Sequence, residues 1–178
     1  MKQCLILLVT VALCLGGGLL SPNLAHAVDV QSTVQLGAAS TCGLQVTGGS
    51  PINYGQLTAA NANSPEPGAK LSIQNTGTTA RAAVTVKGTN WVGSAIVGPV
   101  MDVKTTHFGV IPAGTSIPPP YASKTPLSLT PVSLLPAGTT IAPGAIQDSF
   151  WQVSFVLNAG VTYTGAASQT VTLDSTCQ

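Results

Sequence analysis

Residues 28–36, VDVQSTVQL, form the stretch of sequence that most clearly decides the fold. Every second side chain falls on one of two faces: Val28, Val30, Ser32, Val34 and Leu36 on the first, and Asp29, Gln31, Thr33 and Gln35 on the second. Successive side chains of a strand point to opposite sides of the sheet, so this period of two is typical of a strand with one buried face. The stretch therefore predicts a half-buried β-strand that ends at the small residues 37–40.

The chain beyond residue 40 predicts further short strands and no helix of useful length. Gly and Pro residues separate segments that are rich in Val, Thr and Ile and in which apolar side chains recur at every second position. These segments lie at 44–46, 52–55, 71–73, 82–86, 100–104, 151–157, 161–163 and 171–173. The Asn75-Thr76-Gly77-Thr78 turn predicts a hairpin between 71–73 and 82–86. Both faces of 151–157 are largely apolar, which predicts a central strand. The Gly- and Pro-rich middle predicts only short strands near 127–129 and 132–135. Roughly seven to nine short strands predict an all-β sandwich.

The first 27 residues have the pattern of a cleaved export signal. Lys2 precedes an apolar run over 4–20, and Ala25-His26-Ala27 is a small-x-small cleavage pattern, which places cleavage before Val28. The alternative is a retained membrane anchor, but a run of about 17 residues is at the low end for spanning a bilayer. We therefore expect a signal peptide over 1–27 and one secreted domain over 28–178, extracellular or at the cell surface, with no membrane span after cleavage.

The charge of the exported domain is balanced. Lys2 leaves with the signal, and the remaining basic residues then equal the 5 acidic ones in number. No basic patch is present to bind phosphates, which argues against nucleic acid as a partner. A domain with little charge also has little electrostatic repulsion to oppose self-association.

Cys42 and Cys177 are the two cysteines of the exported domain, and an even number in an exported chain predicts one disulfide. A bond between Cys42 and Cys177 would close a loop of about 135 residues, and by loop-closure entropy it would stabilise the fold by on the order of 4–5 kcal/mol. Two thiols and His107 are too few ligands for a metal site.

The sequence offers little catalytic chemistry. His107 has no cysteine or carboxylate beside it, the acidic residues are scattered, and neither a GxSxG nor an SxxK motif is present. We therefore predict a protein that is not an enzyme and has no cofactor. Trp91, Tyr121 and Trp151 are candidate ligand contacts of a polysaccharide-binding module, although the scarcity of aromatic residues favours tryptophans in the core.

Several motifs resemble those of a known group. The runs Leu71-Ser72-Ile73-Gln74-Asn75-Thr76-Gly77, Val84-Thr85-Val86 and Gly88-Thr89-Asn90-Trp91 resemble immunoglobulin-like domains of prokaryotic, especially archaeal, secreted and cell-surface proteins. A looser similarity, carried by Cys42 and Tyr54-Gly55, is to pilin-like and spore-coat-type subunits. The resemblance implies an immunoglobulin-like antiparallel β-sandwich with structural or adhesive duties.

Two classes of function are consistent with these features. The first is a structural or adhesive subunit, for example of a cell-surface filament or envelope assembly, whose partners are copies of itself or other surface proteins. The second is a secreted binding module for polysaccharide or protein. The strand over 28–36 lies outside the Cys42–Cys177 loop, so we expect Val28, Val30, Val34 and Leu36 to pack either on their own domain or, as a donor strand, on a neighbour.

Overall fold

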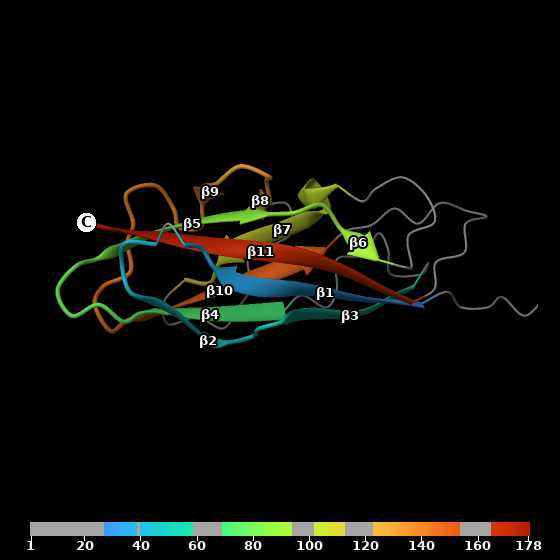
Figure 1. The fold of residues 1–178 in the computed structure, drawn as a ribbon, viewed down its shortest axis with the longest axis horizontal. Helices are drawn as coiled ribbons and strands as arrows, with labels where there is room; N and C mark the ends of the chain where they lie inside the picture. The colour runs from blue at the N-terminus through green and yellow to red at the C-terminus, as the bar shows by residue number, and fades with distance from the viewer. Residues whose placement is uncertain (1–26, 39, 59–68, 94–101, 113–122, 154–164) are drawn as a thin grey trace, which may run out of the picture.

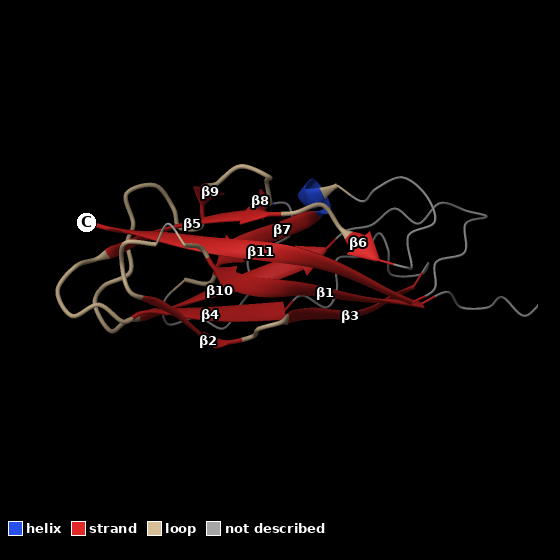
Figure 2. Cartoon of the chain, in the orientation of Figure 1, coloured by secondary structure: helices blue, strands red, loops and turns tan. Residues whose placement is uncertain are grey.

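The computed structural model describes residues 27–38, 40–58, 69–93, 102–112, 123–153 and 165–178. These residues form two β-sheets packed face to face around one core, so the predicted all-β sandwich is confirmed at this level (Figure 1, Figure 2). The described part of the chain also contains the 3-10 segment η1 (Val103–Thr105).

The two sheets have the following strand orders. The first sheet runs β3 (Ile52–Thr58), β1 (Ala27–Leu36), β11 (Gly165–Cys177), β5 (Ala82–Gly88) and β9 (Val132–Ser133), with β6 (Val92–Gly93) also paired to β11. The second sheet runs β2 (Leu44–Gly48), β4 (Ala69–Asn75), β10 (Ile146–Val153), β7 (Thr106–Val110) and β8 (Thr125–Pro126). Among the described pairs, β1 with β11 is parallel, and the others are antiparallel. The prediction of an antiparallel sandwich is therefore wrong for this pair, and the described residues form 11 strands rather than the seven to nine predicted.

The core lies between the two sheets and is supplied by alternate residues of their strands. In β5 and β11 every second side chain is buried, which is the pattern expected of strands with one face on a core. Trp151 and Phe108 pack with ring centroids 5.2 Å apart, and Tyr54 and Trp91 pack edge to face at 5.9 Å. β10 lies between β4 and β7, so the prediction of a central strand is confirmed for residues 151–153, although the strand begins earlier, at Ile146. Residues 154–157 of the predicted strand lie outside the described residues.

The predicted hairpin between 71–73 and 82–86 is wrong, because the two segments belong to different sheets. β4 pairs with β2 and β10, whereas β5 pairs with β11 and β9. The connection crosses between the sheets, and Asn75 stabilises it: its side-chain amide donates to the carbonyls of Ala80 (2.9 Å) and Ile141 (3.0 Å) and accepts from the backbone of Gly77 (2.9 Å). Alternation shows that each segment has a buried face, but it does not show which sheet the segment joins.

Two other strand predictions also need correction. Val103–Thr105 is the 3-10 turn η1 rather than the end of a strand over 100–104, and the strand begins at Thr106. The Asp102 side chain caps this turn by accepting from the backbone of Lys104 at 2.9 Å. The strand predicted near 127–129 lies slightly earlier in the chain, as β8, which ends at Pro126. The strand predicted over 161–163 lies outside the described residues.

Candidate functional site

The candidate site is the position of β1 in the first sheet, which we call the β1 site: the strand together with its two neighbours, β3 and β11. β1 runs parallel to β11, with Val28 opposite Gly165 and Leu36 opposite Leu173, and antiparallel to β3. In Figure 1, β1 (blue) and β11 (red) lie side by side and run toward the end of the molecule that carries the C-terminus. The first and last strands that the structure describes are thus neighbours.

The inward face of β1 matches the sequence prediction only in part. Val30 and Ser32 are fully buried, and Val34 is half-buried against the core. Leu36 was expected to be buried, but 45% of its surface is exposed, because it lies near the end of the sandwich where β1 leaves the sheet. The side chain of Val28 lies outside the described part of the chain.

Ser32 lies at the centre of a buried hydrogen-bond network that the alternation alone does not predict. Its hydroxyl donates to Gln169 Oε1 on β11 at 3.2 Å and lies 3.1 Å from the Tyr54 hydroxyl on β3. A serine hydroxyl has one hydrogen, so Tyr54 is the donor to Ser32. β1 therefore connects the polar groups of its two neighbouring strands through one side chain.

The same network continues across the core to the second sheet. Gln169 Oε1 accepts a second hydrogen bond from Thr106 Oγ1 on β7 at 2.9 Å, and the Trp91 indole donates to Thr106 Oγ1 at 3.1 Å. The Gln169 amide nitrogen donates to the carbonyl of Thr89 at 2.7 Å. Burial raises the pKa of the Tyr54 hydroxyl, so it remains a protonated donor in the network.

These contacts make the β1 site selective for register. A shift of β1 by two residues would replace Ser32 with Val30 or Val34, and neither can bond to Tyr54 or Gln169. A buried polar group left without a partner costs about 1–3 kcal/mol. The site therefore fits a strand with a hydroxyl between two valines, at the spacing found in residues 30–34.

The segment after β1 contains more chain than its path requires. The backbone N–H of Gly37 donates to the Leu173 carbonyl, and that of Thr41 donates to the Ser175 carbonyl, both at 2.8 Å. Thus the four steps from Gly37 to Thr41 cover a path for which β11 needs two. We call residues 37–40 the hinge segment; of these, the structure describes Gly37, Ala38 and Ser40, and Ala39 lies outside the described residues.

Gly37 lies close to β11 where the hinge segment begins. A Cβ atom there would overlap the Asp174 carboxylate of β11, so a larger residue would force that side chain to move. Asp174 Oδ1 is itself buried and has no hydrogen-bond partner among the described residues. A buried carboxylate oxygen without a partner is unfavourable, so the closed hinge segment has a local cost that water would relieve if the segment opened.

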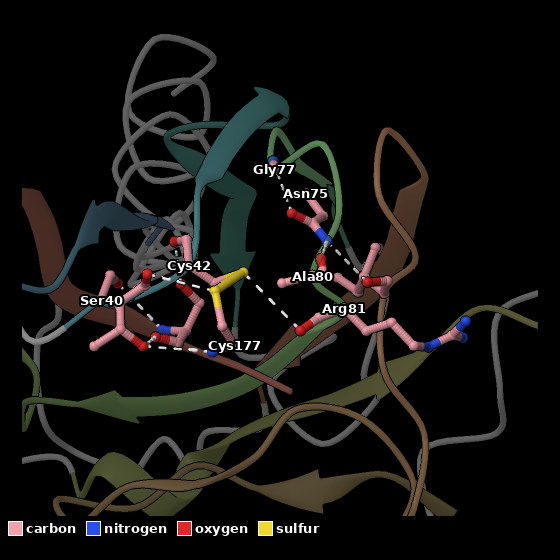
Figure 3. Close-up of a disulfide and its surroundings, with 10 residues drawn as sticks. Ser40, Cys42, Asn75, Gly77, Ala80, Arg81 and Cys177 are labelled. Carbon is pink, nitrogen blue, oxygen red and sulfur yellow. Dashed lines mark hydrogen bonds between the residues drawn. A yellow bond between two sulfur atoms is a disulfide. The ribbon is translucent and has the colours of Figure 1, made fainter.

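The disulfide closes the sandwich next to the hinge segment. Cys42 and Cys177 are paired as the sequence predicts, with Cα atoms 4.8 Å apart (Figure 3). Ser175 ties the same region together: its hydroxyl donates to the Cys42 carbonyl at 2.7 Å, and its backbone N–H donates to the Ser40 hydroxyl at 3.1 Å. β1 lies outside this loop, whereas the other described strands lie within it.

The aromatic residues proposed as ligand contacts do not form an exposed row. Trp91 and Trp151 are at most 1% exposed, and each indole N–H donates to a core hydroxyl, that of Thr106 or of Ser149. Their use as surface ligand contacts is therefore corrected, and their position agrees with the alternative of core packing. Tyr121 lies outside the described residues.

The outer face of the second sheet carries the ionisable groups nearest to His107. His107 is half-buried, and its pKa is lowered by burial and by the charge of Lys124, against the effect of a backbone hydrogen bond at Thr105. Lys124 is 6% exposed, lies 5.3 Å from the centroid of Phe150 and donates to Gln152; burial lowers its pKa. Within the described ranges no three His, Cys, Asp or Glu side chains are grouped to hold a metal ion.

Asp148 forms the ion pair of this face. It accepts from the Ser72 hydroxyl at 2.6 Å and from Lys70 Nζ at 3.0 Å, and these contacts lower its pKa. The pair is partly exposed, so its contribution to stability is small.

No helix in the described residues is long and apolar enough to cross a membrane. No protein-family model matches the chain, and no curated protein sequence matches it.

Proposed function

We propose that the protein is an extracellular structural or adhesive subunit, an immunoglobulin-like β-sandwich, that takes part in a cell-surface assembly by exchanging strand β1 with a neighbour. The observation that carries the proposal is the combination found at the β1 site. The strand lies outside the disulfide loop, is joined to the domain by a hinge segment with excess length, and fills a register-selective position between β3 and β11.

The energetics of exchange support the proposal. A donated β1 would make the same contacts on a neighbour as on its own domain, so the free energy of these contacts largely cancels between the two arrangements. Hinge strain and concentration then decide which arrangement is populated. The balanced charge of the exported domain does not oppose close approach of two copies.

The predicted export signal and the disulfide support an extracellular location. Disulfides persist in oxidising compartments, and the Cys42–Cys177 pair lies at the end of the sandwich where β1 leaves the sheet. The immunoglobulin-like assignment rests on the motifs around Asn75-Thr76-Gly77 and Gly88-Thr89-Asn90-Trp91 together with the two-sheet architecture.

The proposal is tested by measuring whether β1 can be replaced in the folded protein. A protease recognition sequence is inserted after Ala38 in the mature protein, and cleavage then leaves residues 28–38 bound without a covalent link. Fluorescently labelled peptide 28–36 is added, and its incorporation is followed by anisotropy. We expect the labelled peptide to replace the resident strand.

Two variant peptides give the control. The Ser32→Ala peptide should compete about 10-fold less well, because it leaves Tyr54 and Gln169 with fewer partners. The Thr33→Ala peptide removes a hydroxyl from the exposed face and should compete like the native peptide. No incorporation of any peptide, or equal competition by both variants, would contradict the proposal.

A further inference from the structure

The direction of β1 determines which ends of two molecules can meet, and this inference rests on the function proposed above. Because β1 is parallel to β11, its last residue, Leu36, lies opposite Leu173, four residues before Cys177. The hinge segment therefore leaves the β1 site close to the disulfide. A strand donated by a second copy would keep this register, because Ser32 must reach Tyr54 and Gln169.

The hinge segment also limits how far apart the two domains can be. The five steps from Leu36 to Thr41 span at most roughly 17 Å when fully extended. Five strands at about 4.8 Å spacing make a sheet about 19 Å wide, so this reach is no longer than the width of one domain. The donor's Thr41 must consequently lie within roughly 17 Å of the acceptor's Leu173, so the disulfide ends of the two copies come within about one domain width of each other.

In this arrangement each molecule donates its own β1 and receives the β1 of its neighbour at the same end, the one with the disulfide. A head-to-tail filament requires the donor strand to leave at one end and the acceptor position to be entered from the opposite end. Here a third copy would have to occupy the space already filled by the second. The second copy's own β1 site, by contrast, is within reach of the first copy's free strand.

We propose that exchange of β1 is reciprocal and closes into a two-fold dimer, in which two copies meet at their Cys42–Cys177 ends and each supplies the other's β1. The partner at the β1 site is thus a second copy of this chain. Asp174 favours the exchanged dimer over the closed monomer, because straightening the hinge segment opens its buried, unpartnered oxygen to water or to the second copy.

The first test joins β1 to β3 covalently. Gln31 and Asn53 are partners across these strands, and both side chains are exposed. The mature protein carrying Gln31→Cys and Asn53→Cys is concentrated and then separated by gel filtration. We expect a dimer that stays covalently linked in non-reducing electrophoresis. We expect the monomer to contain the same bond within one chain. The wild-type protein is the matched control: its dimer should have no covalent link between the two chains.

Each outcome of this test is informative. A dimer that separates into internally linked monomers shows that the copies meet without exchanging β1, which overturns both the exchange and the reciprocal dimer. Absence of any oligomer at high concentration also overturns both the exchange and the reciprocal dimer. A covalent ladder of trimers and higher species keeps strand exchange and overturns the reciprocal dimer alone.

The second test changes hinge reach without altering β1. Multi-angle light scattering of the wild-type protein should show monomer and dimer as its species. A flexible Gly/Ser insertion after Ala38, long enough to pass the width of one domain, should permit higher oligomers because the disulfide ends no longer have to meet. Higher oligomers already present in the wild-type protein would refute the geometric argument, even if the double cysteine variant failed to fold.

Discussion

Replacement of Ser32 by alanine tests whether the polar network fixes β1 in its site. The variant removes a hydroxyl that donates to Gln169 and accepts from Tyr54, and both partners are fully buried. Gln169 keeps its bond from Thr106, so the main loss falls on the Tyr54 hydroxyl. A buried donor left without this partner costs about 1–3 kcal/mol, and we expect a decrease of about 2 kcal/mol in the free energy of unfolding.

The measurement is urea-induced unfolding of the oxidised mature protein, with thermal unfolding as a second probe. A loss of about 2 kcal/mol in a domain of this size lowers the melting temperature by about 4–8 °C. Tyr54→Phe and the double variant complete a double-mutant cycle. Because Tyr54→Phe removes the group that Ser32→Ala leaves without its partner, the two losses should fall short of additivity by about 1 kcal/mol.

Thr33→Ala is the matched control, because Thr33 is the next residue on the exposed face and should change the free energy by less than about 0.5 kcal/mol. The reasoning would be refuted if Ser32→Ala cost no more than this control, or if the effects of Ser32→Ala and Tyr54→Phe were additive.

Three further predictions concern the disulfide and the ionisable groups. Replacing both Cys42 and Cys177 by alanine should lower the free energy of unfolding by on the order of 4–5 kcal/mol in denaturant titrations; non-reducing peptide mapping of the native protein should recover the two cysteines in one linked peptide pair, and free thiols would contradict this. His107→Ala should leave dimer formation unchanged and alter the free energy of unfolding by about 1–2 kcal/mol at most, whereas loss of a catalytic or metal-dependent activity in the folded variant would refute the non-enzymatic interpretation. Asp148 has a lowered pKa in the folded state, so its stabilising contribution is present above the ordinary carboxyl pKa of about 4 and is lost as the pH falls through the folded value; the stability difference between Asp148→Asn and the native protein should therefore shrink on acidification, and a difference that grows would contradict the assignment.

The strands themselves could largely be predicted from the sequence, because alternation reports a buried face directly. It identifies β1, β4, β5 and the central β10 by residues that are buried in the structure. The sequence could not show that β1 lies beside β11, since parallel pairing of the two ends of a chain leaves no local pattern. The false hairpin at 75–78 has the same cause, because a turn signal does not distinguish a hairpin from a crossing between sheets.

The candidate site was predictable to a smaller extent. The alternation places Ser32 on the apolar face of β1, but its partners come from strands far away in the chain. Gln169 occupies the same face of β11 as Val171 and Leu173, and a glutamine at such a position is a sequence signal for a buried polar contact. Tyr54 and Thr106 carry no comparable signal, and the close approach of Gly37 to the Asp174 carboxylate depends on a residue far away in the chain.

The central claim, that β1 of one copy occupies the β1 site of another, is tested most directly by NMR on a mixed sample. Copies labelled with carbon-13 and unlabelled copies are combined, concentrated under exchange conditions and separated into monomer and dimer. Isotope-filtered spectra then detect contacts between chains. We predict contacts from the Val30 methyl groups of one copy to the Tyr54 ring of the other in the dimer, and none in the monomer. A dimer in which every contact between Val30 and Tyr54 lies within one chain would contradict the account.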